Sequence, residues 1–269
     1  MINRKNGLTF LLAAMLLFSG QLCAQGTVFF SAPVAITTDG NHALASMLER
    51  IGHLYSTPID FEEAPIEHPS DMVVGPVMMK SGLHPVFARG GKLTVQLDKN
   101  DVDAYQAVLT VLAAYTNSGL PGSYQAFNEG DRVDVIPMQA RGSDGFTHNV
   151  IPIMASKISL DYKARSTYSL LDDISSAISK VSGRTVYASI TGAPESMAPG
   201  EISGFSGGTA RSVLATIAGF SYQALFDPGA NAYYLNVQPA VIRSAPGPST
   251  VTKRNTTGLP QTSPFWVKE

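Results

Sequence analysis

Cysteine is almost absent from this sequence, because Cys23 is the only one among 269 residues. A single thiol cannot form a disulfide within the chain, and no cysteine pair is present to hold a metal ion. Charge is also sparse: 15% of the residues are charged, with 19 basic and 21 acidic side chains and no basic stripe. We therefore expect no nucleic-acid partner.

Long hydrophobic runs occur only near the N-terminus. Two basic residues precede the apolar run GLTFLLAAMLLFSG, and QLCAQ follows it, an order typical of a secretory signal peptide. We expect residues 1–24 to be removed by cleavage after Ala24, leaving an exported, periplasmic or secreted chain. Acylation of Cys23 is the alternative, and it is disfavoured because the preceding Leu22 is not small. No later run is long enough to span a bilayer.

A short sequence is repeated. Ser-Tyr-Gln-Ala occurs at 123–126 and again at 221–224, each time after an apolar helical pattern and at the start of a predicted hairpin. The preceding helices also match, with AVLTVLA at 107–113 and SVLATIA at 212–218. A duplication explains these parallels.

The order of the predicted elements indicates an α+β fold class. We expect two tandem small domains of βαβ-βαββ type, and neither needs the other to close a core. The predicted boundaries are 28–140 for the first module with an inserted loop at 67–90, 141–156 for a linker, and 157–239 for the second module. Residues 240–269 are rich in Pro, Ser, Thr and Gly and are predicted to be a disordered tail.

Capping residues place the ends of two helices. Asp101 is predicted to begin the helix that Gly119 ends, because glycine readily adopts the left-handed conformation after a helix. Ser166 or Thr167 is predicted to begin the helix that Gly183 ends.

The second half resembles a known family. The sequences ISLDYKARSTYSLLDDISSAISKVSGRTVYASITG and GFSGGTARSVLATIAGFSYQALFDPGANAYYLNV are similar to the secretin and TonB N-terminus short domain. The resemblance extends over 158–237 and, more loosely, over 36–138. Phe220 or Ser221 departs from the Gly-Leu that is common in the family.

That resemblance implies a fold and a contact role. Family members are usually protein-contact modules of the Gram-negative periplasm, in secretin channels or outer-membrane receptors, and the resemblance supplies no catalytic residues. No barrel-forming region follows the module in this sequence, which leaves the contact role as the expectation.

Met and His residues gather in the predicted loop. Met72, Met78, Met79 and His84 lie there, and such side chains are either adaptable apolar contacts or soft ligands for copper. We favour contact with a partner and predict neither a metal nor a cofactor.

Two acidic pairs invite a catalytic interpretation. Glu62 and Glu63 lie on a predicted strand, where neighbours point to opposite faces and cannot converge on one substrate. Asp172 and Asp173 are placed in the first turn of a helix, where the dipole favours negative charge. We expect both pairs to be structural and the protein not to be an enzyme.

Sheet edges are the other candidate surface. AYYLNV at 232–237 and RVDVIPM at 132–138 are predicted edge strands, which invite strand addition by a partner. Tyr233 and Tyr234 point in opposite directions, so one of them should face outward as an anchor.

The sequence therefore predicts an exported, non-enzymatic protein-interaction or adaptor module of a Gram-negative envelope assembly, with an envelope protein as partner. The alternative is a periplasmic small-ligand or metal-binding protein that uses a cleft between the modules. The partner and the oligomeric state stay open.

Overall fold

The computed structural model describes residues 27–28, 30–76, 84–191, 202–217 and 220–239, and it confirms the α+β class. The first half contains, in order, β1 (Val34–Thr38), α2 (Ala43–Tyr55), β2 (Ile59–Glu62), η1 (Pro69–Asp71), β3 (Met72–Val74), β4 (Val86–Ala88), β5 (Leu93–Leu97), α3 (Ala104–Ser118), β6 (Ser123–Asn128) and β7 (Val133–Arg141). The second half contains β8 (Thr147–Asn149), η2 (Ile153–Ala155), β9 (Lys157–Ala164), α4 (Thr167–Ser182), β10 (Thr185–Ile190), β11 (Ile202–Thr209), α5 (Ala210–Ile217), β12 (Phe220–Asp227) and β13 (Ala232–Pro239). None of the described helices is long and apolar enough to cross a membrane.

The two halves repeat the same strand pairings. β1 is antiparallel to β5, as β9 is to β11. β2 runs parallel to β7, as β10 does to β13, and each hairpin, β6–β7 and β12–β13, is antiparallel. The repetition of Ser-Tyr-Gln-Ala therefore marks one fold position, the start of β6 and of β12.

Both halves contribute to one sheet, with the strand order β10-β13-β12-β2-β7-β6 and with β8 paired to β7. The halves meet where β2 runs parallel to β12, with Phe61 opposite Gln223 and Glu62 opposite Ala224. We call this contact the junction. Its continuity was not anticipated from the sequence, which suggested two modules joined only by a linker.

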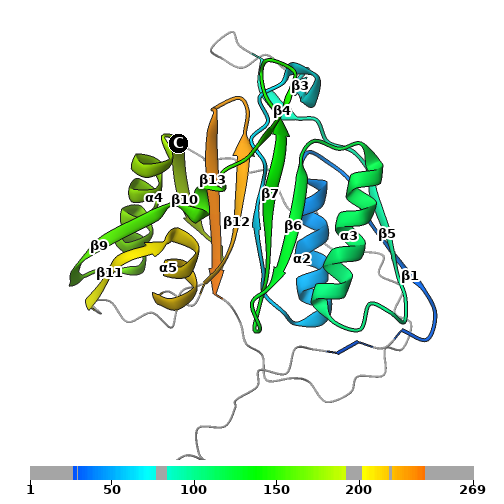
Figure 1. The fold of residues 1–269 in the computed structure, drawn as a ribbon, viewed down its shortest axis with the longest axis horizontal. Helices are drawn as coiled ribbons and strands as arrows, with labels where there is room; N and C mark the ends of the chain where they lie inside the picture. The colour runs from blue at the N-terminus through cyan, green and yellow to red at the C-terminus, as the bar shows by residue number, and fades with distance from the viewer. Residues whose placement is uncertain (1–26, 29, 77–83, 192–201, 218–219, 240–269) are drawn as a thin grey trace, which may run out of the picture.

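The helices of the two halves lie on opposite faces of the sheet (Figure 1). On β2, Ile59 and Phe61 pack with α2 and α3, whereas Glu62, which follows Phe61, binds the backbone of η2 from the other face. Alternating side chains of a strand point to opposite faces, so each face of the central strands covers a different core.

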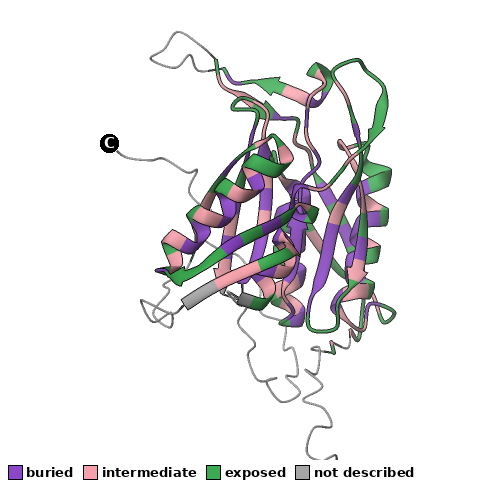
Figure 2. Ribbon diagram, turned by 60° about the vertical axis from the view of Figure 1, so that its left-hand side comes forward, coloured by how far each residue is buried: buried purple, intermediate pink, exposed green. Residues whose placement is uncertain are grey.

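There are accordingly two hydrophobic cores, and the buried residues of the central strands separate them (Figure 2). The first holds the apolar stripe of α2, which is buried throughout: Leu44, Met47, Leu48, Ile51 and Tyr55. The second holds Tyr222, which is fully buried together with Ala224 of the same strand face. Tyr222 therefore points into the second core.

Helix ends follow the predicted caps with one correction. Ser166 caps α4, and Gly119 and Gly183 take φ values of +69° and +71° after α3 and α4. The cap of α3 is Asp103, whose side chain accepts the N–H of Gln106 at 2.9 Å, and not Asp101. The carboxylate of Asp101 instead accepts the backbone N–H of Asp98, three residues earlier, at 2.7 Å.

Two predicted irregular segments contain regular structure. The loop at 67–90 includes η1 and the antiparallel pair β3–β4, around residues 77–83 that lie outside the described part. The linker at 141–156 includes β8, which extends the sheet, and η2, which contacts the second core. The predicted signal peptide and tail also lie outside the described residues.

Candidate protein-interaction surface

Three carboxylates on or next to β2 hold the junction together. Asp60 accepts the backbone N–H of Tyr222 at 3.0 Å, and Glu63 accepts that of Phe226 at 2.9 Å. Between these two contacts the backbone N–H of Glu63 donates to the carbonyl of Ala224 at 2.8 Å. Only two residue pairs of β2 and β12 are aligned, so the carboxylates extend the hydrogen bonding between these strands beyond the aligned pairs.

Glu62 binds the segment that enters the second half. Its two oxygens accept the N–H groups of Ile153 and Met154 of η2 at 2.6 and 3.1 Å, and the side chain is fully buried. Burial raises the pKa of Glu62 to about 7, while the two N–H donors and Arg211 act to lower it. Glu62 and Glu63 bind different elements, which agrees with the expected structural role.

An ion pair adds charge compensation at the junction. Nη1 of Arg132 lies 3.0 Å from Oδ2 of Asp60 and also donates to the carbonyl of Phe220 at 3.1 Å. Burial raises the pKa of Asp60, although Arg132 acts to lower it. These carboxylates are occupied by protein donors, so they are components of the fold rather than groups aimed at a substrate.

The other acidic pair is also structural. Asp173 lies 2.7 Å from Nε of Arg165 and 3.1 Å from Nζ of Lys163, and the Arg165 hydrogen bond lowers its pKa. Asp172 and Asp173 lie beyond the first turn of α4, which contains no acidic residue, so the dipole explanation is wrong for them. Asp173 instead forms ion pairs with Lys163 near the end of β9 and with Arg165, which follows the strand.

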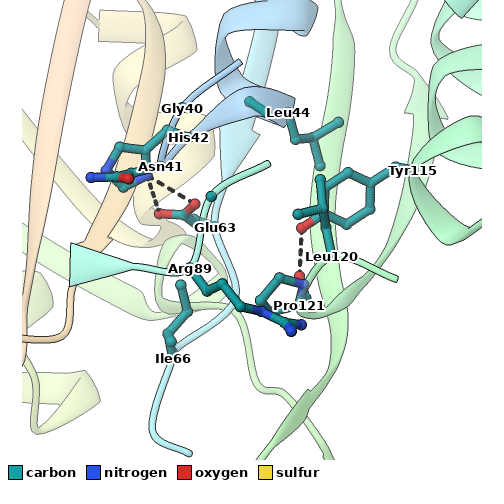
Figure 3. Close-up of a pocket in the computed structure, with 12 residues that line it drawn as sticks. Gly40, Asn41, His42, Leu44, Glu63, Ile66, Arg89, Tyr115, Leu120 and Pro121 are labelled. Atoms are coloured by element: carbon teal, nitrogen blue, oxygen red, sulfur yellow. Dashed lines mark hydrogen bonds and ion pairs between the residues drawn. The ribbon is translucent and has the colours of Figure 1, made fainter. Parts of the chain in front are cut away.

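A small pocket lies beside His42 (Figure 3). Nδ1 of His42 is 3.0 Å from both carboxylate oxygens of Glu63. Burial lowers the pKa of His42, but the Glu63 carboxylate raises it more, so the net shift is upward. The free volume is about 10 Å³, roughly that of one water molecule, so the pocket has no room for a ligand.

A larger groove of about 570 Å³ lies between the two halves. Residues from β7, β8, the segment before η2 and the end of α4 line it, including the exposed side chains of Ile151 and Val181. Three charged residues and one histidine also line it, and each has a protein partner: Arg184 binds Glu67, Arg141 binds Ser70 and His148 binds Asp144.

Of the loop residues Met72, Met78, Met79 and His84, the described ones, Met72 and His84, make separate contacts. Met72 packs against the second core from β3, and Nδ1 of His84 is 2.9 Å from the carbonyl oxygen of Gly75. Met78 and Met79 lie outside the described residues. Within the described ranges no group of three His, Cys, Asp or Glu side chains is placed to hold a metal ion.

The edges of the sheet are not the strands that the sequence suggested. β13 (AYYLNV) and β7 (RVDVIPM) each have a partner on both sides, so the prediction of edge strands there is wrong. The outer strands are β10 and β6. Alternating hydrophobicity identified the strands, but it could not distinguish a central strand, which pairs along both edges, from an edge strand, which pairs along one.

Of the two tyrosines, Tyr233 is ruled out as a surface residue. It is 1% exposed, and its hydroxyl donates to the carbonyl of Glu63 at 3.2 Å. Tyr234 is 41% exposed and lies against Tyr187 of β10, which is 53% exposed, with ring centroids 5.5 Å apart. Tyr187 was missed in the sequence because its partner on the adjacent strand was unknown.

The outer edge of β10 presents backbone groups. The N–H of Thr191 donates to Val237 of β13, whereas the N–H of Val186 points the other way, to Oγ of Ser179. Alternation along the strand therefore directs the N–H and C=O groups of Ala188 and Ile190 away from β13. No strand of the described residues pairs with them.

No protein-family model, curated protein or solved structure matches this chain. The resemblance of the second half to the secretin and TonB N-terminus short domain therefore stays a prediction from the sequence.

Proposed function

We propose that this chain is a non-enzymatic protein-binding module of a Gram-negative envelope assembly, and that its binding surface is the outer side of β10 together with Tyr187 and Tyr234. We call this surface the β10 edge. The observation that carries the proposal is the outward direction of the Ala188 and Ile190 backbone groups. Export follows from the signal peptide expected at residues 1–24.

The chemistry of the β10 edge suits strand addition. An extended segment of a partner would pair with the outward backbone groups, and main-chain hydrogen bonds of this kind supply affinity in β-augmentation. Tyr187 and Tyr234 lie beside the paired strand, where a large ring with a polar end is a common anchor of interfaces. No charged side chain is present among Thr185–Ile190, so the edge does not repel either sign of charge.

The junction within the chain supports strand addition by analogy. β2 holds in the first half the position that β10 holds in the second, and β12 pairs with it in parallel. Strand addition at the β10 edge would repeat a pairing already present within the chain.

Site-specific photocrosslinking tests the proposal in cells. A photoreactive amino acid replaces Ser189, which is exposed on β10, and the matched control carries it in place of Tyr168, which is exposed on α4. We expect a crosslinked product of defined mass from position 189 and none from position 168. No product at 189, or the same product at both positions, would contradict the proposal.

A small-ligand role is the second candidate, and the groove between the halves is the observation that favours it. The volume of about 570 Å³ lies within the range of ligand sites. Its charged residues are already paired, so an uncharged, largely apolar molecule would fit it best. A compound that raises the melting temperature of the parent chain but not of an Ile151→Trp variant would support this role.

A further inference from the structure

The two outer strands of the sheet, β10 and β6, correspond to the two strands that form the junction, β2 and β12. Tyr124 of β6 lies opposite Pro137, and Tyr222 of β12 lies opposite Val237. The shared Ser-Tyr-Gln-Ala therefore makes β6 the counterpart of β12. By the same alignment β2 is the counterpart of β10, because each runs parallel to the second strand of its hairpin.

The backbone groups of the two edge pairs also correspond. Pro137 and Val237 lie opposite the two tyrosines, so they correspond, and four residues before them Val133 corresponds to Tyr233. The partner of Val133 on β2 is Ile59, and the partner of Tyr233 on β10 is Val186. Phe61 then corresponds to Ala188. Both lie two residues further along their strands, so Ala188 directs its N–H outward from β10 as Phe61 does toward β12.

The opposite edge offers the complementary groups. In the junction the N–H of Tyr222 points toward β2, where Asp60 accepts it. Tyr124 holds this position on β6, opposite Pro137 of β7. The N–H of Val133 on β7 donates to the carbonyl of Pro58, and alternation directs the backbone groups of Pro137 to that same side, away from β6, so Tyr124 and Pro137 form a non-hydrogen-bonded pair. The N–H of Tyr124 therefore points outward from β6, where no strand of the described part of the chain pairs with it.

We propose that the occupant of the β10 edge is a second copy of this chain, which pairs its β6 in parallel with β10 and so repeats the junction between molecules. The inference rests on the proposed function, because it names the partner of the same edge. The aligned register places Gln125 of one copy opposite Ala188 of the other, as Gln223 lies opposite Phe61 within the chain.

The side chains beside the edge match this arrangement. In the junction, α5 lies over Asp134 through Arg211. Between two copies, the counterpart of Asp134 is Tyr234, beside Tyr187, in the copy that offers β10. The counterpart of Arg211 is Gln106, on α3 of the copy that offers β6. Leu109, one turn further along α3, is 38% exposed, whereas its counterpart Leu214 is fully buried. The intermolecular contact would therefore place an exposed leucine near an exposed tyrosine pair, where the junction has an ion pair.

Repetition of the junction does not close on itself. β12 is parallel to β2. Its counterpart β6 is antiparallel to β2, because β2 is parallel to β7 and β7 is antiparallel to β6. The two halves are therefore related by a half-turn about an axis across the strands together with a translation along that axis. A heterologous contact of this kind adds further copies to the ends and does not stop at a dimer.

The intermolecular contact should be weaker than the junction. Asp60 and Glu63 accept the N–H groups of Tyr222 and Phe226 on either side of the short ladder. Their counterparts on β10 are Tyr187 and Ile190, which carry no carboxylate. Fewer hydrogen bonds hold the added strand, so association should appear only as concentration rises.

Disulfide trapping tests the predicted register. In a chain with Cys23→Ser, one preparation carries Gln125→Cys and the other carries Ala188→Cys. We expect a disulfide-linked heterodimer when the two are mixed, and its loss when Tyr168→Cys replaces Ala188→Cys. A yield equal to that of the Tyr168→Cys mixture would overturn the proposal.

Sedimentation velocity supplies an independent readout. We expect the sedimentation coefficient of the parent chain to increase with concentration, and Ala188→Pro to abolish the increase. Proline at this position removes an outward N–H and leaves the ladder with β13 intact. An unchanged melting temperature would show that the variant folds, and if it does not fold, the disulfide experiment decides.

The outcomes separate the two proposals. Crosslinking at position 189 to a different protein, with a purified chain that stays monomeric, would overturn the second-copy inference and retain the proposed function. Absence of any crosslink at position 189 in cells, together with a monomeric purified chain, would overturn both.

Discussion

Arg211 of α5 and Asp134 of β7 form an ion pair between the two halves, with Nη1 3.1 Å from Oδ2. Neither counterpart in the repeat is charged, since Gln106 and Tyr234 hold these positions. The pair therefore belongs to the junction and not to the repeated fold. The same is true of Asp60 and Glu63, so acidic residues were placed where one copy of the repeat meets the other.

Removing the cation of this pair should destabilise the fold. Asp134 is buried, and burial raises its pKa to about 7 although Arg211 acts to lower it. Arg211→Met leaves the carboxylate without its ion-pair partner, which costs about 3 kcal/mol of unfolding free energy for a buried pair. Urea unfolding at pH 7.5 measures this loss.

The double variant Arg211→Met/Asp134→Leu is the control for that measurement. Replacing both members of a buried ion pair by apolar residues is often neutral, so we expect it to recover much of the lost free energy. A double variant as unstable as the single one would show that Arg211 acts through another contact, such as its hydrogen bond to the Tyr222 hydroxyl.

The stability of the protein should fall as pH rises toward neutrality. The pKa of Glu62 is raised from 4.5 to about 7, so the folded state binds a proton that the unfolded state has lost between these values. Unfolding free energy then decreases from pH 4.5 to 7, by up to about 3 kcal/mol for this group. The raised pKa of His42 acts in the same direction above pH 6.5.

Melting temperatures measured from pH 4.5 to 8 check this dependence. Glu62→Gln should make the decline below pH 7 shallower, because the amide does not titrate, whereas Asp134, whose pKa is also raised to about 7, still contributes to the decline. If parent and variant show the same decline, Glu62 is ionised in the folded protein throughout this range.

Leu214 and Leu109 offer a matched pair of truncations at one position of the repeat. Leu214 is fully buried in the second core, so Leu214→Ala should cost about 3 kcal/mol through lost burial and a cavity. Leu109 is 38% exposed, and Leu109→Ala should cost less than about 1 kcal/mol. Denaturant unfolding of both variants measures the difference, and equal losses would contradict the placement of Leu214 in the core.

Tyr187 should matter for binding and not for folding. Its ring is 53% exposed and contacts Tyr234, so Tyr187→Ser should change the unfolding free energy by less than about 1 kcal/mol. The same substitution should reduce crosslinking at position 189. Tyr168→Ser, on the exposed face of α4, is the control and should leave crosslinking unchanged.

Much of the local structure was predictable because its causes lie within a few residues. Ser166 caps α4 through the N–H of Ser169, and Gly183 ends it with a positive φ. The stripe of α2 and the repeated hairpins follow from residue spacing alone. The cap of α3 was misplaced by two residues because Asp101 and Asp103 are both acceptable acceptors.

The α+β class, the repeat and the helices could be predicted from the sequence, since hydrophobic periodicity and capping are local properties. The pairing of β2 with β12, the outer positions of β10 and β6, and the burial of Tyr233 beside the exposed Tyr187 became known only from the folded chain. These outcomes depend on hydrogen bonds between residues more than 160 positions apart, such as that of Asp60 with Tyr222. A strand pattern specifies which side chains share a face, but it does not specify which neighbour takes its backbone groups.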